Sequence, residues 1–125
     1  MRVLASGVIR VLCPVVAFLA CQLVFASDWC DALVIDQTGK ISSTEKTVAS
    51  AANQLVSRGA DVRVRIVSDI GQEPTLDKFI DQIRKNCPSW QALDGGMKNN
   101  LIVLAVSLGN RKTGLYYGSQ WSSVL

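Results

Sequence analysis

Three aspartates are the residues of this 125-residue chain whose type and position could support chemistry. Asp36 and Asp69 each follow a short apolar run that is typical of a β-strand, and Asp94 lies in a later loop. Open α/β sheets bind ligands at the carboxyl ends of their strands, and hard cations prefer carboxylate oxygens. The pattern predicts a Ca²⁺ or Mg²⁺ site at Asp36, Asp69 and Asp94, where the metal could orient a phosphate ester and its attacking water.

Turn formation is the alternative role for the same aspartates. Asp36 with Gly39 is typical of a turn in which the carboxylate accepts backbone N–H groups, and Asp94 with Gly95 is a common turn pair. Both roles stay open, and Asp36 is the strongest functional candidate of the three.

The sequence contains no histidine, which excludes several kinds of catalytic site. A Ser-His-Asp triad, a Cys-His dyad and a His-ligated zinc site cannot be built from this chain alone. A glycine-rich phosphate loop of the G-x-x-x-x-G-K type is also absent from the sequence. An enzyme of this sequence would therefore have to use carboxylates and a metal.

The chain begins with the pattern of an export signal. Arg2 and Arg10 form a basic start, an apolar run follows at 11–21, and Val24, Phe25 and Ala26 provide a cleavage site. We expect cleavage after Ala26.

Cleavage there would give a signal peptide at 1–26 and a mature domain at 27–125 that is exported to a periplasm, a lumen or the extracellular space. Two alternatives stay open, a retained membrane anchor over 8–26 and a lipid attached to Cys21. No transmembrane segment is expected in the mature chain.

The mature chain is close to neutral. The sequence has 13 Lys and Arg against 10 Asp and Glu, and the signal removes two of the arginines. A strongly basic balance, which would imply a nucleic-acid or acidic-lipid partner, is therefore absent, and no nucleic-acid partner is expected.

The same cleavage would leave Cys30 and Cys87 as the only cysteines of an exported domain, and we expect a disulfide between them. Such a bond stabilises the fold by about 4 kcal/mol in the chain-entropy model. A redox or metal pair is the alternative, although neither close C-x-x-C spacing nor histidine supports it.

The mature chain alternates strands and helices. Apolar runs predict strands at 33–35, 62–66, 101–106 and 113–117. Helical periodicity predicts one helix between Ser42 and Gly59, and a second that opens at Pro74 and Thr75 and extends to Cys87. The run at 101–106 lacks alternation, which indicates a central strand that is buried on both faces. The order β-α-β-α-β-β predicts an α/β domain with a mixed sheet of about four strands between helices.

Helix ends and one further helix are also predicted. Ser42 with Glu45 forms a capping box before the first helix, and Gly59 stops that helix. Near the last residues, the spacing of Trp121 and Val124 is typical of the first turn of another amphipathic helix, before which the given chain would be truncated.

Two side-chain groups have open roles. Arg63 and Arg65 alternate with valines, which predicts a strand with one wetter face or an edge position; these arginines either bind an anionic partner or form a solvated face. Four aromatic residues form either a partner-binding patch or core and rim packing. These are Trp90, Tyr116, Tyr117 and Trp121.

Several stretches resemble the TPM domain family. Residues 34–42 resemble its opening strand, Asp-x-x-Gly turn and helix entry, and 59–64 resemble its second strand. Residues 99–104 with Arg111 and 116–118 resemble its Asn-rich entry to a buried strand and its aromatic-Gly exit. The family includes thylakoid-lumen proteins of photosystem II repair, exported bacterial proteins and accessory proteins of acetylcholine receptors.

The resemblance implies an α/β sandwich in an exported or membrane-associated protein. It further implies an accessory, assembly or maintenance role at a membrane protein complex, and some family members are assigned divalent-cation binding or phosphatase activity. The leading hypothesis is therefore an exported TPM-like accessory domain that binds Ca²⁺ or Mg²⁺. The alternative is a metal-dependent phosphatase that acts on phosphate esters through Asp36 and its neighbours.

Overall fold

A computed structural model describes residues 29–125, so the predicted signal peptide at 1–26 lies outside the described residues. The chain divides into the units Met1–Cys30 and Asp31–Leu125, and the fold below is that of the second unit. Within the described part of the chain, no helix is both long and apolar enough to cross a bilayer.

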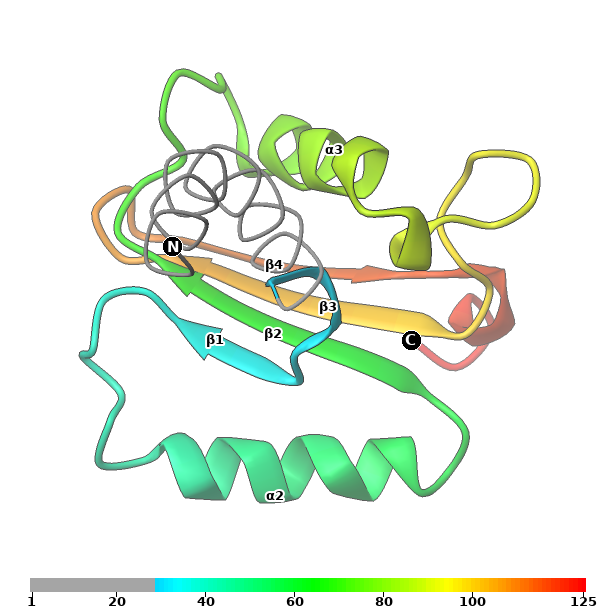
Figure 1. Ribbon diagram of the computed structural model, residues 1–125, viewed down its shortest axis with the longest axis horizontal. Coiled ribbons are helices and arrows are strands. Elements are labelled where there is room, and N and C mark those ends of the chain that lie inside the picture. The colour runs from blue at the N-terminus through cyan, green and yellow to red at the C-terminus, as the bar shows by residue number, and fades with distance from the viewer. Residues whose placement is uncertain (1–28) are drawn as a thin grey trace, which may run out of the picture. The chain divides into compact units, whose positions relative to one another are not determined.

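A four-stranded mixed sheet forms the centre of this unit (Figure 1). Its strands are β1 (Val34–Asp36), β2 (Asp61–Val67), β3 (Leu101–Ser107) and β4 (Lys112–Tyr117), and they lie in that order across the sheet. β1, β2 and β3 are parallel, and β4 is antiparallel to β3. The predicted α/β class with a mixed sheet is confirmed.

Two helices cover opposite faces of the sheet (Figure 1). α2 (Glu45–Val56) packs on β1 and β2, whereas α3 (Leu76–Asn86) packs on β3 and β4 from the other side. Because β1, β2 and β3 follow one another in one direction, helices on opposite faces give the two crossovers opposite hands. One crossover therefore departs from the usual right-handed rule.

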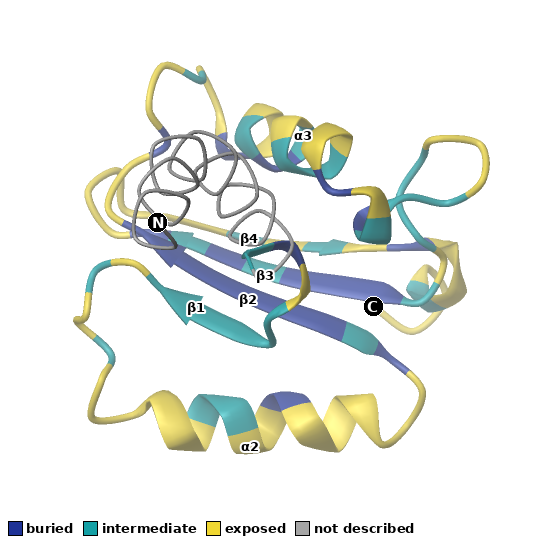
Figure 2. Cartoon of the chain, in the orientation of Figure 1, coloured by how far each residue is buried: buried dark blue, intermediate teal, exposed yellow. Residues whose placement is uncertain are grey.

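β3 is the central strand that its apolar run predicts. Leu101 and Val103 are fully buried on the sheet face opposite α2, and Figure 2 shows burial concentrated on β2 and β3. On the α2 side, side chains of β2, β3 and α2 form one apolar cluster. Its buried members are Ala52, Ala60, Val62, Val64, Ile66 and Ile102.

β2 differs from its prediction. It lies between β1 and β3 rather than at an edge, and the side that alternation marked as wetter is buried. Arg63 is 8% exposed and Arg65 only 1% exposed. The prediction was wrong because period-two alternation shows only which side chains of a strand are polar. Segments that are distant in the sequence, among them Trp90, cover this side of β2.

The helix ends agree with the sequence in part. Gly59 adopts φ +98° after α2, as a left-handed C-terminal stop requires. The capping box at Ser42 and Glu45 does not form, because Thr44 is the N-cap and its side chain makes no capping hydrogen bond. At α3, the hydroxyl of the N-cap residue Thr75 does accept a backbone N–H at 3.1 Å.

Candidate functional site

The carboxyl ends of β1 and β2 form the edge where the fold favours a ligand. The chain leaves β1 for α2 on one face and leaves β2 for α3 on the other, so the two connections diverge at this edge. Open α/β sheets bind ligands outside the carboxyl ends of their strands. Asp36 ends β1 and Asp69 follows β2, so the structure brings both to this edge. Asp94 precedes the parallel strand β3 and therefore lies at the opposite edge.

The Asp36 carboxylate organises the turn that leads toward α2. Its Oδ1 accepts hydrogen bonds from the backbone N of Thr38 at 2.9 Å and from the Thr38 hydroxyl at 2.5 Å. Its Oδ2 accepts from the backbone N of Ile41 at 3.0 Å. These hydrogen bonds, with the Thr38 hydroxyl first, lower the pKa of Asp36. The carboxylate thus has the turn-forming role that was one of its two predicted roles.

Asp69 and Asp94 make similar local turns. Asp69 Oδ1 accepts from the backbone N of Gly71 at 2.8 Å, and Asp94 Oδ1 accepts from the backbone N of Gly96 at 2.9 Å. Among residues 29–125, no group of three or more His, Cys, Asp or Glu side chains gathers as a metal-binding set. The structure thus brings two of the three predicted ligands to one edge and does not bring in the third.

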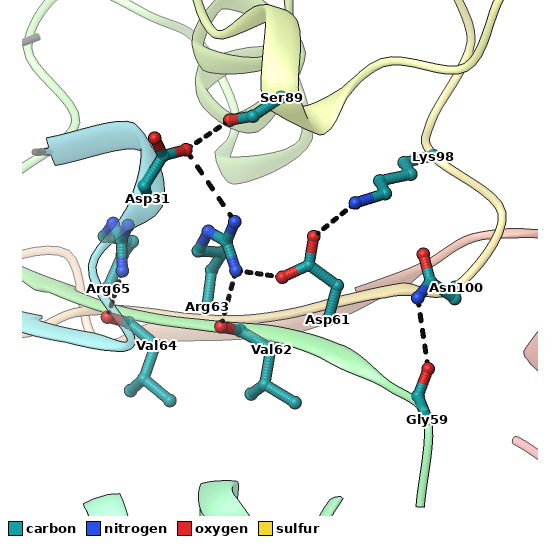
Figure 3. A network of polar contacts seen from close by, with 10 residues as sticks. All are labelled: Asp31, Gly59, Asp61, Val62, Arg63, Val64, Arg65, Ser89, Lys98 and Asn100. Carbon is teal, nitrogen blue, oxygen red and sulfur yellow. Dashed lines mark hydrogen bonds and ion pairs between the residues drawn. The ribbon is translucent and has the colours of Figure 1, made fainter. Parts of the chain in front are cut away.

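Arg63 is held by a polar network on the α3 side of β2 (Figure 3). Its guanidinium pairs with the carboxylate of Asp61 and donates to the carbonyl oxygen of Val62 at 3.0 Å. Asp31 Oδ1 lies 3.8 Å from Arg63 Nη2 and accepts from the Ser89 hydroxyl at 2.6 Å. Two carboxylates therefore surround the positive charge of Arg63, which gives it a structural role rather than an exposed anion site.

Asp61 joins this network to the loop before β3. Lys98 Nζ donates to Asp61 Oδ2 at 2.8 Å, and Figure 3 shows Arg63 and Lys98 on either side of the carboxylate. Burial alone would raise the pKa of Asp61, but its contacts with Lys98 and Arg63 outweigh burial and lower the pKa. Asp61 is therefore an ionised link between the β2 and β3 segments.

Arg65 lies deeper than Arg63. Its Nη1 donates to the carbonyl oxygen of Val64 at 2.9 Å, and its guanidinium lies over the ring of Trp90. Burial lowers the pKa of Arg65 to about 9. The predicted solvated face is therefore wrong for both arginines, and neither is presented to an outside partner.

Cys30 and Cys87 form the predicted disulfide. Both cysteines are buried, with 6% and 3% of their surfaces exposed. Cys87 follows α3 and also caps the short helix η1 (Pro88–Trp90). The bond therefore fastens the chain next to the segment that covers Arg65.

The four aromatic residues have different positions. Trp90 is fully buried, so it is part of the core, and Trp121 packs partly buried against the α2-side cluster. Tyr116 is half-buried and donates its hydroxyl hydrogen to Asp77 Oδ1 at 2.7 Å. Tyr117 is 36% exposed. Of the four, Tyr117 is the exposed one, so the prediction of a partner-binding patch now concerns Tyr117 and the surface around it.

One cavity at the carboxyl edge involves residues that motif analysis did not identify. It has a volume of about 480 Å³ and lies between the start of α3 and β4. Asp77, Arg111 and Lys112 line it together with Tyr116. In the sequence, Arg111 stands out only as part of the family resemblance. No sequence pattern joins it to Asp77, because these residues belong to separate elements.

Comparison with known proteins identifies no relative of this chain. A scan against protein-family models, a search of curated proteins and a search of solved structures each find no match for this chain.

Proposed function

We propose that this protein is an exported TPM-like domain that acts as an accessory or assembly factor by binding a subunit of a membrane protein complex. One observation carries the proposal, an apolar sheet surface on the α2 side of β3 and β4. We call this surface the β3–β4 face and define it by Leu104, Val106, Leu115 and Tyr117.

Strand register places these four side chains on one side of the sheet. Leu104 and Val106 pack against the α2-side cluster yet remain only partly buried. Leu115 is paired with Leu104, and Tyr117 with the cluster residue Ile102. Residues that are directly opposite in an antiparallel pair share a face, so the apolar surface continues from β3 onto β4.

The β3–β4 face is accessible because α2 covers the neighbouring strands. α2 packs on β1 and β2, and Leu115 and Tyr117 are 48% and 36% exposed. Figure 2 shows the change from the buried centre of the sheet to the more exposed β4. Contiguous exposed apolar residues that include an aromatic ring are typical of protein-binding surfaces. A binding module is therefore a better match to this geometry than a catalytic site.

Site-specific photocrosslinking tests this proposal. A benzoylphenylalanine in place of Leu115 should form an adduct with a membrane protein when the producing cells are irradiated. The same probe in place of Gln54, an exposed residue of α2, is the matched control and should form none. Equal labelling from both positions, or no adduct from Leu115, would contradict the proposal.

Metal-dependent phosphatase activity is the alternative function, with Ca²⁺ or Mg²⁺ held at Asp36 and Asp69. It has less support, because both carboxylates accept hydrogen bonds from their own turns. The assay is hydrolysis of p-nitrophenyl phosphate by the purified protein with Ca²⁺, Mg²⁺ or EDTA. Activity that requires the metal and disappears in Asp36→Ala would establish this alternative. Activity that is unchanged by EDTA and by Asp36→Ala would exclude it.

A further inference from the structure

The cavity beside α3 has a different character from the β3–β4 face. It lies at the carboxyl edge of the sheet, where the start of α3 meets the hairpin between β3 and β4. Its lining includes Thr75 and Asp77 from the start of α3, and Arg111, Lys112 and Tyr116 from the hairpin and β4. A volume of about 480 Å³ is within the range of small-molecule sites.

The hairpin that carries the basic residues is fastened to the loop before α3. Gly109 N donates to the carbonyl oxygen of Ser68 at 2.6 Å, and a Cβ at Gly109 would lie only 2.4 Å from that oxygen. Asn110 Oδ1 accepts from the backbone N of Ile70 at 3.2 Å and from the Ser107 hydroxyl at 2.7 Å. These contacts hold the two walls of the cavity together.

The wall of β4 is shaped by Gly114 and Tyr116. A Cβ at Gly114 would lie 2.6 Å from the Tyr116 ring, so glycine gives that ring its place on the strand. The ring hydroxyl then reaches Asp77 at the start of α3 with a 2.7 Å hydrogen bond. The bond joins β4 to the start of α3 across the cavity.

The charge of the lining favours an anion. Arg111 and Lys112 are exposed, and neither forms an ion pair with any described residue. Among the described residues that line the cavity, Asp77 is the one that is acidic, and one of its oxygens already accepts the Tyr116 hydroxyl hydrogen. The described side chains that line the cavity, two basic and one acidic, therefore have a net charge of one positive unit, and the start of α3 adds a positive partial charge.

We propose that this cavity binds a single phosphomonoester group, with Arg111 and Lys112 as the residues that hold it. A guanidinium can donate two parallel hydrogen bonds to phosphate oxygens, and an ammonium adds a point charge. The carboxylate of Asp77 disfavours a longer polyphosphate, because each added phosphate would bring more negative charge to it. The group could belong to a soluble molecule or to a lipid headgroup, which present the same chemistry.

This inference is independent of the proposed binding of a membrane protein. Lys112 and Tyr116 alternate along β4 with Leu115 and Tyr117, so the two pairs point to opposite faces of the sheet. Because Leu115 of the β3–β4 face also lines the cavity, the test of phosphate binding substitutes Arg111 and leaves Leu115 unchanged.

An NMR titration of the ¹⁵N-labelled protein tests the proposal. Phenyl phosphate and inorganic phosphate, at constant ionic strength, should produce saturable shifts at 75–78 and 111–114. Arg111→Asn should weaken binding by about tenfold or more, the factor expected for one charge-assisted hydrogen bond. Asparagine suits this position because Arg111 has φ +54°, a region that Asn tolerates, so the fold should persist.

The matched control is Arg58→Gln, which also removes one positive charge but from an exposed site after α2. It should leave phosphate binding unchanged. Flotation with phosphatidylcholine vesicles that contain phosphatidic acid distinguishes the sources, because binding to these vesicles without binding of phenyl phosphate identifies a lipid headgroup. Absence of saturable binding in both experiments, or equal weakening by the two variants, would overturn the proposal.

Discussion

The guanidinium of Arg65 lies over the ring of Trp90, with its central carbon 5.7 Å from the ring centroid. Both side chains are almost completely removed from solvent, at 1% and 0% exposure. The negative face of an aromatic ring attracts a cation and replaces part of its lost hydration. This contact helps to explain how Arg65 can lie buried in a central strand, as the carboxylates of Asp61 and Asp31 do for Arg63.

Loss of Trp90 should therefore be costly. We expect Trp90→Ala to lower the free energy of unfolding by about 3–5 kcal/mol, because it opens a core cavity and uncovers a buried charge. Urea unfolding followed by circular dichroism measures the change. Trp121→Ala is the control, since Trp121 is only partly buried, and it should cost less than half as much. Equal losses would contradict the central role of the Trp90 contact.

The success of the strand predictions and the failure at Arg63 and Arg65 have one physical origin. The apolar run at 101–106 identified a central strand because six apolar residues can be buried on both faces without compensation. The alternating arginines were predicted to be solvated because a charged side chain that is buried needs a partner. Arg63 has a local partner in Asp61, but its second carboxylate, Asp31, and the Trp90 ring beside Arg65 come from distant parts of the chain. Local periodicity contains no information about these distant partners.

The candidate site was predictable to the extent that its contacts are local. The turn around Asp36 follows from its spacing to Gly39, and the hydrogen bonds of Asp36 lie within five residues of it. The missing capping bond at Ser42 and the cavity at Arg111 depend on how separate segments meet. Tertiary contacts decide both, so the sequence alone did not reveal them.

Acid should destabilise the fold partly through Asp61. Although burial would raise the pKa of Asp61, contacts with Lys98 and Arg63 lower it. A carboxyl with a lowered folded-state pKa stabilises the fold above its unfolded pKa of about 3.9, and this contribution disappears as the pH falls through the folded-state pKa. We expect the free energy of unfolding to decline below about pH 4 and Asp61→Asn to make that decline shallower.

Urea titrations between neutral and acid pH measure this effect. Asp94→Asn is the matched control, because Asp94 is exposed and lies outside the network, and it should keep the wild-type slope. An unchanged slope in Asp61→Asn would show that the network with Lys98 contributes nothing to acid sensitivity.

Reduction of the Cys30–Cys87 disulfide should also destabilise the fold. The bond closes a loop of nearly sixty residues, for which chain entropy predicts a loss of about 4 kcal/mol on reduction. Urea unfolding with and without dithiothreitol measures this loss. A Cys30→Ser, Cys87→Ser variant should match the reduced protein and show no further response to dithiothreitol. If the reduced protein unfolds at the same urea concentration as the oxidised one, the disulfide does not stabilise the fold.

Gly118 should tolerate no side chain, because it lies against the backbone of the loop before β3. A Cβ there would be 2.0 Å from the carbonyl oxygen of Lys98 and 2.4 Å from that of Asn99. Backbone atoms cannot move aside as a flexible side chain can, so we expect Gly118→Ala to cost about 2–3 kcal/mol or to prevent folding. Gly96→Ala is the control, since its Cβ would meet only the Asp94 side chain at 3.1 Å. Equal stability of the two variants would refute this close approach at the end of β4.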